Sequence, residues 1–213
     1  MQVVEKFISL NGEGMRAGEL SCFIRFKGCN LACAYCDTVW ANAQDTAFSE
    51  ESAEEIAAYV SESGARRVTL TGGEPLLQKD ILSLVKMLSG EYNKLVEIET
   101  NGSMDISPYC EMRNVSVTMD YKLRHSGFEQ EMLISNFLCL TAADSVKFVV
   151  ADLTEVAHAV DLVREHRLSE KCAVFLSPVF GEIRPRDIAD YLIENRINDV
   201  RLQLQLHKVI DVR

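Results

Sequence analysis

The sequence contains few of the residues that mark linkers between domains. Only four of its 213 residues are proline, and no stretch is rich in glycine and serine. It also has no internal repeat and no low-complexity segment. Because domain boundaries usually fall in such stretches, we expect residues 1–213 to form a single domain, and this length is sufficient for a sizeable hydrophobic core.

Long hydrophobic runs are also missing from the chain. No apolar run reaches the roughly 20 residues that a membrane-spanning helix needs. The first six residues, MQVVEK, lack the basic start and the long apolar stretch of a signal peptide. We therefore expect a cytoplasmic protein that does not interact with membranes.

Positive charge is scarce in this chain. Lys and Arg together number 22 against 32 Asp and Glu, which gives a net charge of −10. A protein that binds nucleic acid through its phosphates usually has a basic face. The basic clusters here are short, such as Arg66-Arg67 and the pair Arg184 and Arg186. We therefore expect no direct binding of nucleic acid.

Cysteine is present in an odd number, seven, and three of these residues are crowded together. Cys29, Cys33 and Cys36 form the pattern C-x3-C-x2-C within the segment GCNLACAYCDT. In a reducing compartment such a cluster indicates metal binding or redox chemistry, and not a set of disulfides. We expect the four scattered cysteines to be small buried hydrophobic residues. They are Cys22, Cys110, Cys139 and Cys172.

Short apolar runs alternate with helical patterns along the chain. Such runs are typical of parallel strands that are buried on both faces. The predicted strands are Cys22–Phe26, Arg67–Thr71, Leu95–Glu99, Val115–Met119, Ser145–Val150, Ala173–Ser177 and Val200–Leu204. The predicted helices are Ser52–Ser63, which begins with a capping box of Ser52 and Glu55, Lys79–Leu88, Thr154–His166 and Arg186–Glu194.

This alternation predicts an α/β fold with a parallel sheet and right-handed crossovers, either open or curled into a full or partial barrel. In each of these arrangements ligands bind at the C-terminal ends of the strands. Four polar or glycine-rich segments directly follow predicted strands. They are the cysteine cluster, TGGEP (71–75), ETNGS (99–103) and DYKL (120–123). We therefore expect these segments to meet on one rim of the sheet.

The clustered cysteines fit an iron–sulfur cluster better than other sites. A [4Fe–4S] cluster has four iron corners, usually held by cysteine thiolates, so three cysteines leave one iron open to another ligand. A zinc site usually takes four ligands, commonly from two separated pairs, and no second C-x2-C pair is present. Three unrelated buried cysteines are the remaining alternative, although chance rarely produces this spacing.

The C-x3-C-x2-C pattern resembles the signature of the radical S-adenosylmethionine (SAM) enzymes. In that family SAM binds the open iron, and its cleavage by the reduced cluster yields a 5′-deoxyadenosyl radical. The resemblance implies a partial (incomplete) parallel βα barrel of the radical SAM type. It also implies that the segment TGGEP holds the methionine end of SAM through Gly72, Gly73 and Glu74.

The order of the motifs resembles one family more closely, the 7-carboxy-7-deazaguanine synthases. The matching segments span essentially the whole chain: LNGEG, FIRFKGCNLACAYCDT, LTGGEP, EIETNGS, MDYKL, VKFVV and LQLQLHK. This resemblance implies a radical ring contraction of 6-carboxy-5,6,7,8-tetrahydropterin with loss of ammonia, on the pathway to queuosine and other 7-deazapurines. It implies Mg²⁺, a homodimer and an external electron donor of the flavodoxin or ferredoxin type. Because the radical derives from the cofactor, no side chain is expected to be catalytic.

The same resemblance implies a set of site residues. Cys29, Cys33 and Cys36 would hold the [4Fe–4S] cluster, and the hydroxyl of Thr38 would bind Mg²⁺. The residues expected to contact SAM are Gly72, Gly73, Glu74, Glu99, Asp120, Tyr121 and Lys122. The residues expected to contact the substrate are Leu10, Asn11, Gly12, Arg25, Thr71 and His207, where Asn11 replaces a glutamine of the family.

Several of these residues have a structural alternative. The guanidinium of Arg25 could form two parallel hydrogen bonds to a substrate carboxylate, or it could form an ion pair within the fold. Thr38 could cap a loop, Tyr121 could pack in the core, and Lys122 could be a solvated surface lysine. For Glu99 a contact with the SAM ribose and a structural role are equally open.

The C-terminal segment LQLQLHKVI is predicted to continue a late strand. Alternation would then place Gln203, Gln205 and His207 on one face, where they either line the barrel or face solvent. We expect the remaining histidines to be surface or loop residues. They are His125, His158 and His166.

Two other functions share some of these motifs. A radical SAM activating enzyme of a glycyl-radical protein would have the cysteines and the GGE-like loop, but it would not need Arg25 and Thr38 arranged for a small carboxylate. A non-enzymatic iron–sulfur electron carrier would normally complete its cluster with a fourth cysteine and would not need TGGEP.

Overall fold

The computed structural model, described for residues 1–212, is built on a nine-stranded sheet with the order β3-β1-β2-β4-β5-β6-β7-β8-β9. β1 pairs antiparallel with both β2 and β3, and every other neighbouring pair is parallel. The strands are β1 (Gln2–Leu10), β2 (Leu20–Phe26), β3 (Ser49–Glu50), β4 (Arg67–Gly72), β5 (Leu95–Thr100), β6 (Val115–Tyr121), β7 (Ser145–Val150), β8 (Ala173–Pro178) and β9 (Arg201–Leu202).

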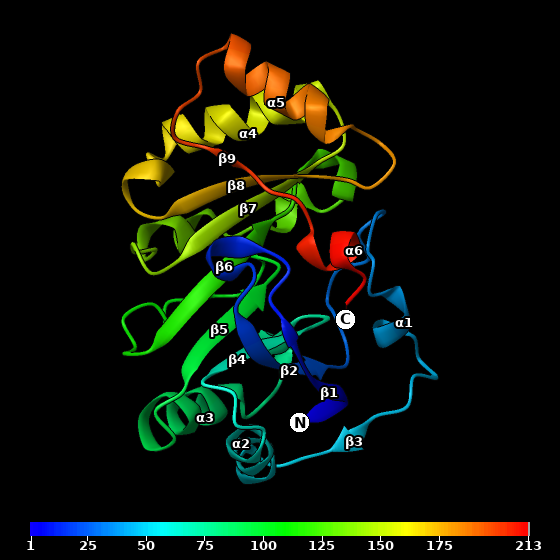
Figure 1. Ribbon diagram of the computed structural model, residues 1–213, viewed down its shortest axis with the longest axis vertical. Helices are drawn as coiled ribbons and strands as arrows, with labels where there is room; N and C mark the ends of the chain where they lie inside the picture. The colour runs from blue at the N-terminus through cyan, green and yellow to red at the C-terminus, as the bar shows by residue number, and fades with distance from the viewer. Residues whose placement is uncertain (213) are drawn as a thin grey trace.

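The parallel strands follow one another around the sheet in chain order, and this order places the crossover helices on its outer face (Figure 1). The helices are α1 (Val39–Asn42), α2 (Ala53–Glu62), α3 (Ile81–Lys86), α4 (Leu153–Glu165), α5 (Pro185–Glu194) and α6 (Leu206–Ile210). β3 and β9 are the two edges of the sheet, so the barrel does not close. The predicted partial parallel βα barrel is therefore confirmed.

Local sequence signals account for where the helices begin. In α2 the backbone N–H of Glu55 donates to the Ser52 hydroxyl at 3.2 Å, and the N–H of Ser52 donates to the Glu55 carboxylate at 2.8 Å. This is the predicted capping box, which satisfies two N–H groups that the helix itself cannot. Pro185 occupies the first turn of α5, where its missing N–H costs nothing.

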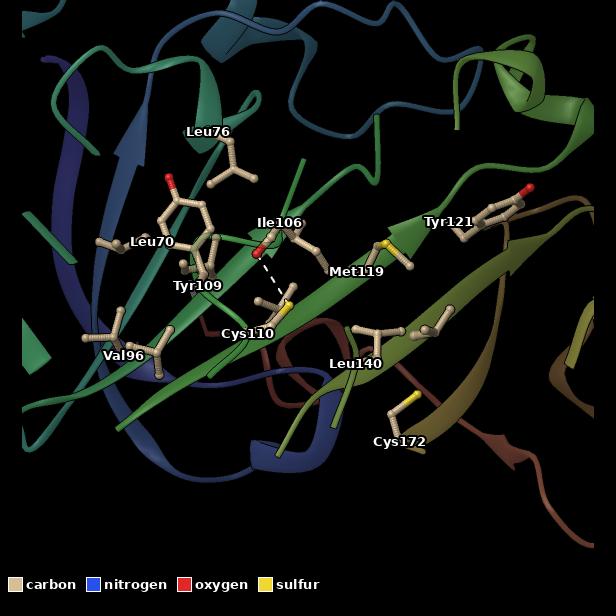
Figure 2. Close-up of a cluster of buried hydrophobic side chains, with 14 of the residues drawn as sticks. Leu70, Leu76, Val96, Ile106, Tyr109, Cys110, Met119, Tyr121, Leu140 and Cys172 are labelled. Atoms are coloured by element: carbon tan, nitrogen blue, oxygen red, sulfur yellow. Dashed lines mark hydrogen bonds between the residues drawn. The ribbon is translucent and has the colours of Figure 1, made fainter. Parts of the chain in front are cut away.

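The hydrophobic core lies between the outer face of the sheet and these helices. Figure 2 shows part of it, with Leu70 of β4, Val96 of β5 and Met119 of β6 close to Ile106 and Tyr109 from the loop after β5. All five side chains are buried. Within the described residues no helix combines the length and the apolar character needed to cross a membrane.

The inner face of the sheet is polar. Neighbouring residues of a strand point to opposite faces, so polar residues that alternate with apolar ones along the strand gather on one face. Each of the four central parallel strands contributes two polar or charged side chains to this face. They are Thr69 and Thr71 of β4, Glu97 and Glu99 of β5, Thr118 and Asp120 of β6, and Ser145 and Lys147 of β7. A hydrophobic outer face and a polar inner face together indicate that ligands bind on the inner side.

The scattered cysteines lie in the core, as predicted. Cys22, Cys110 and Cys172 are buried, and Cys139 packs against the core while half-buried. All four are free thiols, although the Sγ atoms of Cys110 and Cys139 lie only 2.7 Å apart. In Figure 2 the thiol of Cys110 donates to the carbonyl of Ile106.

The ends of the chain differ from the sequence prediction. The long strand β1 was not predicted; only Val3 is buried along it, so it lacks the apolar run of the parallel strands. The predicted strand Val200–Leu204 is wrong beyond Leu202, because the chain leaves the sheet and then forms α6.

One internal helix also differs from the sequence prediction. α3 begins at Ile81, later than predicted, and continues as a π-helical turn over Met87–Glu91.

Candidate functional site

A cavity of about 640 Å³ opens at the C-terminal ends of the parallel strands. All four segments that the sequence placed on one rim contribute to its wall, which confirms that expectation. Most of the predicted site residues line it: Leu10, Arg25, Cys29, Cys33, Cys36, Thr38, Thr71, Gly72, Gly73, Glu99, Asp120, Lys122 and His207. Four of the predicted residues lie elsewhere among the described residues: Asn11, Gly12, Glu74 and Tyr121.

The loop that carries the cysteines is fixed against the TGGEP segment by backbone contacts. The N–H of Glu74 donates to the carbonyl of Gly28 at 2.9 Å. A Cβ atom on Gly73 would lie 2.0 Å from that same carbonyl oxygen, and Gly28 itself has a positive φ of 92°. The two segments can therefore approach this closely only because both positions are glycine.

The three clustered thiols face the cavity and none of them is in a disulfide. Burial raises the pKa of Cys29 and Cys33, because the thiolate loses solvation, although Lys122 acts in the opposite direction on Cys33. The N–H of Leu31 and the amide of Asn101 both point at the Cys29 sulfur, at 3.4 and 3.6 Å. Thiolates would therefore form here mainly with a bound cation.

The thiols fit a multi-iron cluster better than a single ion. Within residues 1–212, no three His, Cys, Asp or Glu side chains converge as the ligands of one ion would. A cubane places each cysteine ligand on a different iron, so its ligands need not converge on one point. The loop therefore suits a [4Fe–4S] cluster held by Cys29, Cys33 and Cys36.

Thr38 lies at the end of the cysteine loop, with its hydroxyl 3.6 Å from the Cys36 sulfur. It is the N-cap residue of α1, but its side chain makes no capping hydrogen bond. The structural alternative for this residue, a loop cap, therefore has no support in the observed contacts. Thr38 is among the residues that line the cavity.

Glu74 lies in the wall behind the cavity, with none of its surface exposed. Its carboxylate accepts hydrogen bonds from the Thr100 hydroxyl and from the N–H groups of Asn101 and Leu76, at 2.7 to 3.0 Å. Burial raises its pKa, and these donors lower it. The side chain thus joins the loops after β4 and β5, so the predicted contact of this carboxylate with SAM has no support in the observed geometry.

Asn11 and Gly12, which were predicted to contact substrate, make contacts within the protein. Asn11 is buried on the inner face of the sheet, where its amide donates to Glu97 at 3.1 Å and its carbonyl accepts from Thr69 at 3.2 Å. Gly12 is covered by His207: a Cβ atom on Gly12 would lie 2.0 Å from the His207 Nδ1. Neither set of contacts could be predicted from local sequence, because each joins residues that are distant along the chain.

The segment 203–207 closes one side of the cavity by binding the loop after β1. The N–H of Leu206 donates to the carbonyl of Gly12 at 2.9 Å, and the N–H of Gly14 donates to the Gln203 side chain at 3.0 Å. The amide of Gln205 donates to Glu13 at 2.5 Å. Gln205 and His207 line the cavity, as one alternative predicted, but they do so from a turn and a helix and not from a strand.

Arg25 and Tyr121 illustrate the two outcomes for residues with a structural alternative. Arg25 lines the cavity, and its Nε donates to Glu5 at 2.8 Å, so its ion pair within the fold and its position at the site coexist. Tyr121 is buried and stacks on Phe137 with ring centroids 5.2 Å apart. The structural alternative, packing in the core, is therefore observed for the Tyr121 side chain, and a contact of this residue with SAM stays a prediction.

A cluster of charged residues occupies the cavity wall around Lys147. The Lys147 Nζ lies 2.5 Å from Glu13 and 3.3 Å from Asp120, and Asp120 also binds the Lys122 Nζ at 3.0 Å. Burial alone would raise the pKa of Glu13 and of Asp120. Lys147 and Lys122 nevertheless hold the pKa of Asp120 below its usual value, and Lys147 does the same for Glu13. The same carboxylates keep the pKa of Lys147 well above its ordinary value, against the effect of burial.

Glu99 is the exception among these acids. Burial, followed by the neighbouring charge of Glu97, raises its pKa to about 7, and Lys147 and a hydrogen bond with Thr71 only partly oppose the shift. Its carboxyl therefore carries a proton for part of the time near neutral pH. This property distinguishes it from Glu13 and Asp120 on the same wall.

Several residues that line the cavity were not predicted from the sequence. Glu13 and Lys147 were inside the quoted motifs LNGEG and VKFVV, where a charged residue beside apolar ones is a usable signal. His125 is exposed, as expected for a surface or loop residue, but it also lines the cavity and stacks parallel to Tyr35 with ring centroids 6.0 Å apart. Phe180, in the loop after β8, lines the mouth although 86% of its surface is exposed.

The family model of the "Radical SAM superfamily" matches residues 23–121 of this chain. This range begins in β2 and ends with β6, so it includes the cysteine loop and the segments after β4 and β5. It therefore covers most of the cavity wall described above.

Curated relatives match the chain almost from end to end. A 7-carboxy-7-deazaguanine synthase of Clostridium acetobutylicum is 50% identical over 210 residues, which cover 98% of this chain and 95% of the relative. One of Methanospirillum hungatei is 37% identical over 212 residues, covering 99% and 85% of the two chains. Among solved structures, the crystal structure of QueE from Escherichia coli is similar with a TM-score of 0.75 and 27% identity, covering 97% of this chain and 94% of the other.

The contact between Gly12 and His207 predicts the effect of adding one methyl group. In Gly12→Ala the new Cβ would overlap the His207 ring, so α6 must move away. We expect the N–H of Leu206 to exchange with deuterium about five- to tenfold faster, as for the loss of one net hydrogen bond of roughly 1 kcal/mol. Hydrogen exchange with mass spectrometry measures this change.

The control for this experiment is Gly90→Ala, because a Cβ atom on Gly90 meets open space. His207→Ala in the Gly12→Ala background should restore part of the protection, since two of the three closest atoms belong to the ring. Unchanged exchange at Leu206 in Gly12→Ala would show that α6 does not depend on this contact.

The raised pKa of Glu99 predicts a pH-dependent stability. Because its pKa is about 7 in the folded protein against an ordinary 4.5, the folded state retains a proton that the unfolded chain releases between these values. The contribution of Glu99 to the free energy of unfolding is therefore complete at acidic pH, and it is lost as the pH rises from 4.5 to about 7. In Glu99→Gln the loss is absent, so the melting temperature of the variant should gain on the wild type from pH 5 to pH 8.

The gain should amount to several degrees, since each kcal/mol moves the midpoint of a chain of this size by about 2–4 °C. Glu91→Gln, at an exposed position, is the matched control and should give a constant difference across this range. If the difference in melting temperature between Glu99→Gln and the wild type is equally constant from pH 5 to pH 8, the pKa of Glu99 is not raised in the folded protein.

Proposed function

This chain belongs to the 7-carboxy-7-deazaguanine synthase family of radical SAM enzymes, and on this premise we propose that it contracts the ring of 6-carboxy-5,6,7,8-tetrahydropterin with loss of ammonia. The observation that supports this function best is that three free thiols share one cavity with Arg25, Asp120, Lys122 and Lys147. Such a site has groups for a cluster and charged groups for polar ligands. The reported relatives give no support to the alternative of a glycyl-radical activating enzyme.

The cofactors of this family are a [4Fe–4S] cluster and SAM, which supply a 5′-deoxyadenosyl radical when bound. Cys29, Cys33 and Cys36 would hold the cluster, because they are the thiols that line the cavity. We propose that the SAM-contacting wall consists of Gly72, Gly73 and the side chains of Asp120 and Lys122. The glycines leave the backbone open to close approach, and the charged pair offers both an acceptor and donors.

We propose that Arg25 binds the carboxylate of the substrate. It lies in the cavity wall, and the ion pair with Glu5 fixes the orientation of its planar guanidinium. Leu10, Thr71 and His207 line the same cavity and complete the proposed substrate contacts. Burial lowers the pKa of His207, so its ring is mainly neutral near pH 7 and can both donate and accept.

We also propose that Thr38 contributes its hydroxyl to a Mg²⁺ ion that arrives with the substrate. Magnesium prefers oxygen ligands in an octahedral arrangement and usually retains several waters or substrate oxygens. One protein hydroxyl is then sufficient as an anchor. The support is that Thr38 lines the cavity, and that its hydroxyl lies 3.6 Å from the Cys36 sulfur and does not cap α1.

The remaining proposals concern the context of the reaction. We propose a cytoplasmic homodimer that receives electrons from a flavodoxin- or ferredoxin-type donor and whose product enters the pathway to queuosine or another 7-deazapurine. The support for the location is the composition of the chain, and the support for the dimer and the donor is the family. Exposed apolar side chains near the cavity mouth, Val39, Trp40 and Phe180, offer surface for such contacts.

The proposed function predicts both a cluster and a product. Anaerobic reconstitution should give about four irons per chain. With SAM, dithionite and 6-carboxytetrahydropterin, the loaded protein should release 7-carboxy-7-deazaguanine and ammonia, measured by chromatography and an ammonia assay. Cys33→Ala should lose most of the iron and all product, because one corner of the cluster is left without its thiolate.

The matched control is Cys22→Ala, which removes a thiol that is buried in the core and does not line the cavity. This variant should keep its iron. A cluster-loaded wild type that forms no product, or one that installs a radical on a glycyl protein, contradicts the synthase function.

The proposed magnesium site makes a separate prediction. Thr38→Ala should raise the Mg²⁺ concentration for half-maximal turnover about tenfold or more. Replacing one supporting residue of a metal site typically lowers the metal affinity by a similar factor. The affinity for SAM should not change, because the open iron holds SAM. Titration of cluster-loaded protein freed of Mg²⁺, following product and SAM binding separately as Mg²⁺ is added, measures both.

Thr46→Ala serves as the control, since its hydroxyl bonds to the carbonyl of Trp40 outside the cavity wall. Turnover that survives chelation of Mg²⁺ in the wild type would remove the metal, and with it this role of Thr38.

A further inference from the structure

Lys147 connects two walls of the cavity that are far apart in the sequence. Its Nζ binds Glu13, from the loop after β1, and Asp120, at the C-terminal end of β6. The side chain is only 14% exposed and lines the cavity. Because Asp120 and Lys147 are direct partners in the register of β6 and β7, the sheet itself holds the ammonium beside the carboxylate.

Asp120 has one oxygen that this network does not use. Its Oδ2 binds both Lys122 and Lys147, at 3.0 and 3.3 Å. Its Oδ1 is buried and has no hydrogen-bond partner within residues 1–212, yet the residue lines the cavity. A buried carboxylate oxygen without a partner costs free energy unless a donor reaches it, so a donor from a ligand in the cavity would stabilise this oxygen.

We propose that Lys147 is a positioning residue that holds the unshared oxygen of Asp120 toward a hydrogen-bond donor of a ligand in the cavity. The inference rests on the proposed function, because the ligand is either SAM or the pterin. Both carry suitable donors, hydroxyl and ammonium groups in SAM and ring N–H groups in the pterin. Lys147 acts through Asp120 and makes no contact with the reacting atoms in this role.

The charges around the three partners determine what replacement of Lys147 would change. Without it, the partner that Glu13 retains among residues 1–212 is the amide of Gln205, whereas Asp120 retains Lys122. Burial would then raise the pKa of Glu13 most and that of Asp120 less. Outside the cluster, Glu99 acts on Lys147, and the charges of the cluster act in turn on Cys33, Tyr35 and His207.

The experiment compares Lys147→Met and Lys147→Arg with the wild type as cluster-loaded protein. SAM affinity is measured by calorimetry without pterin from pH 6 to pH 9, and the KM for the pterin is measured at saturating SAM. Lys147→Met should weaken one of the two ligands about ten- to hundredfold, the range for one charge-assisted hydrogen bond. The acidic limb of that binding should move to higher pH, and Lys147→Arg should recover part of the affinity.

Each outcome has one meaning. Weaker SAM binding assigns the donor to SAM, a higher pterin KM with unchanged SAM binding assigns it to the pterin, and both support the positioning role. Unchanged affinities and pH profiles in Lys147→Met overturn it. Lys86→Met, on the exposed surface of α3, controls for the loss of a lysine.

Two further comparisons keep the test decisive. Where Lys147→Met does not fold, Lys147→Arg decides, because a displaced guanidinium should weaken the ligand while the acidic limb stays in place; wild-type affinity in this variant overturns the inference. Failure of the proposed function is a separate result: an inactive wild type removes the synthase reaction, whereas the SAM arm of the experiment needs no turnover.

Discussion

The structure depends on one constraint: a carboxylate on the inner face of a partial barrel must find donors inside the protein. Glu97 lies at the centre of this face and accepts from the Asn11 amide on one side and the Thr118 hydroxyl on the other. Thr69 donates to Asn11, and Ser145 lies 3.1 Å from Thr118, so polar side chains connect β4 to β7 across the inner face. A buried polar network stabilises a fold only when each of its polar groups has a partner. Because Asn11 supplies one of these partners, this hydrogen-bond network holds the loop after β1 against the sheet.

The carboxyl groups in the cavity wall are also stabilised by groups of the protein, but each has different partners. Glu74 is satisfied by the loop after β5, and Lys147 binds Glu13 and one oxygen of Asp120. The pKa of Glu99 is instead raised to about 7, so its carboxyl is partly protonated near neutral pH. The carboxyls of one wall thus differ in charge because their neighbours differ. The cysteine loop is held by backbone contacts instead, so the thiols can stay free for a cluster while the acids behind them are occupied.

The sequence was sufficient for the features that depend on neighbouring residues. Apolar runs located the parallel strands, Ser52 and Glu55 located the start of α2, and the rule that ligands lie at the ends of parallel strands located the rim. It was insufficient where contacts join distant segments. Neither the covering of Gly12 by His207 nor the pairing of Glu13 with Lys147 has a local signature, since each depends on how the barrel curves.

The contacts between the loop after β1 and the segment 203–207 span 189 and 192 residues of sequence. Contacts of such separation form late, because the entropy of closing a long loop must be overcome before they contribute. The sheet can therefore assemble strand by strand from local crossovers while the last wall of the cavity is still missing. A partly folded chain would have its core and its cysteine loop but no enclosed site, so the capacity to bind ligands reports on the final step of folding.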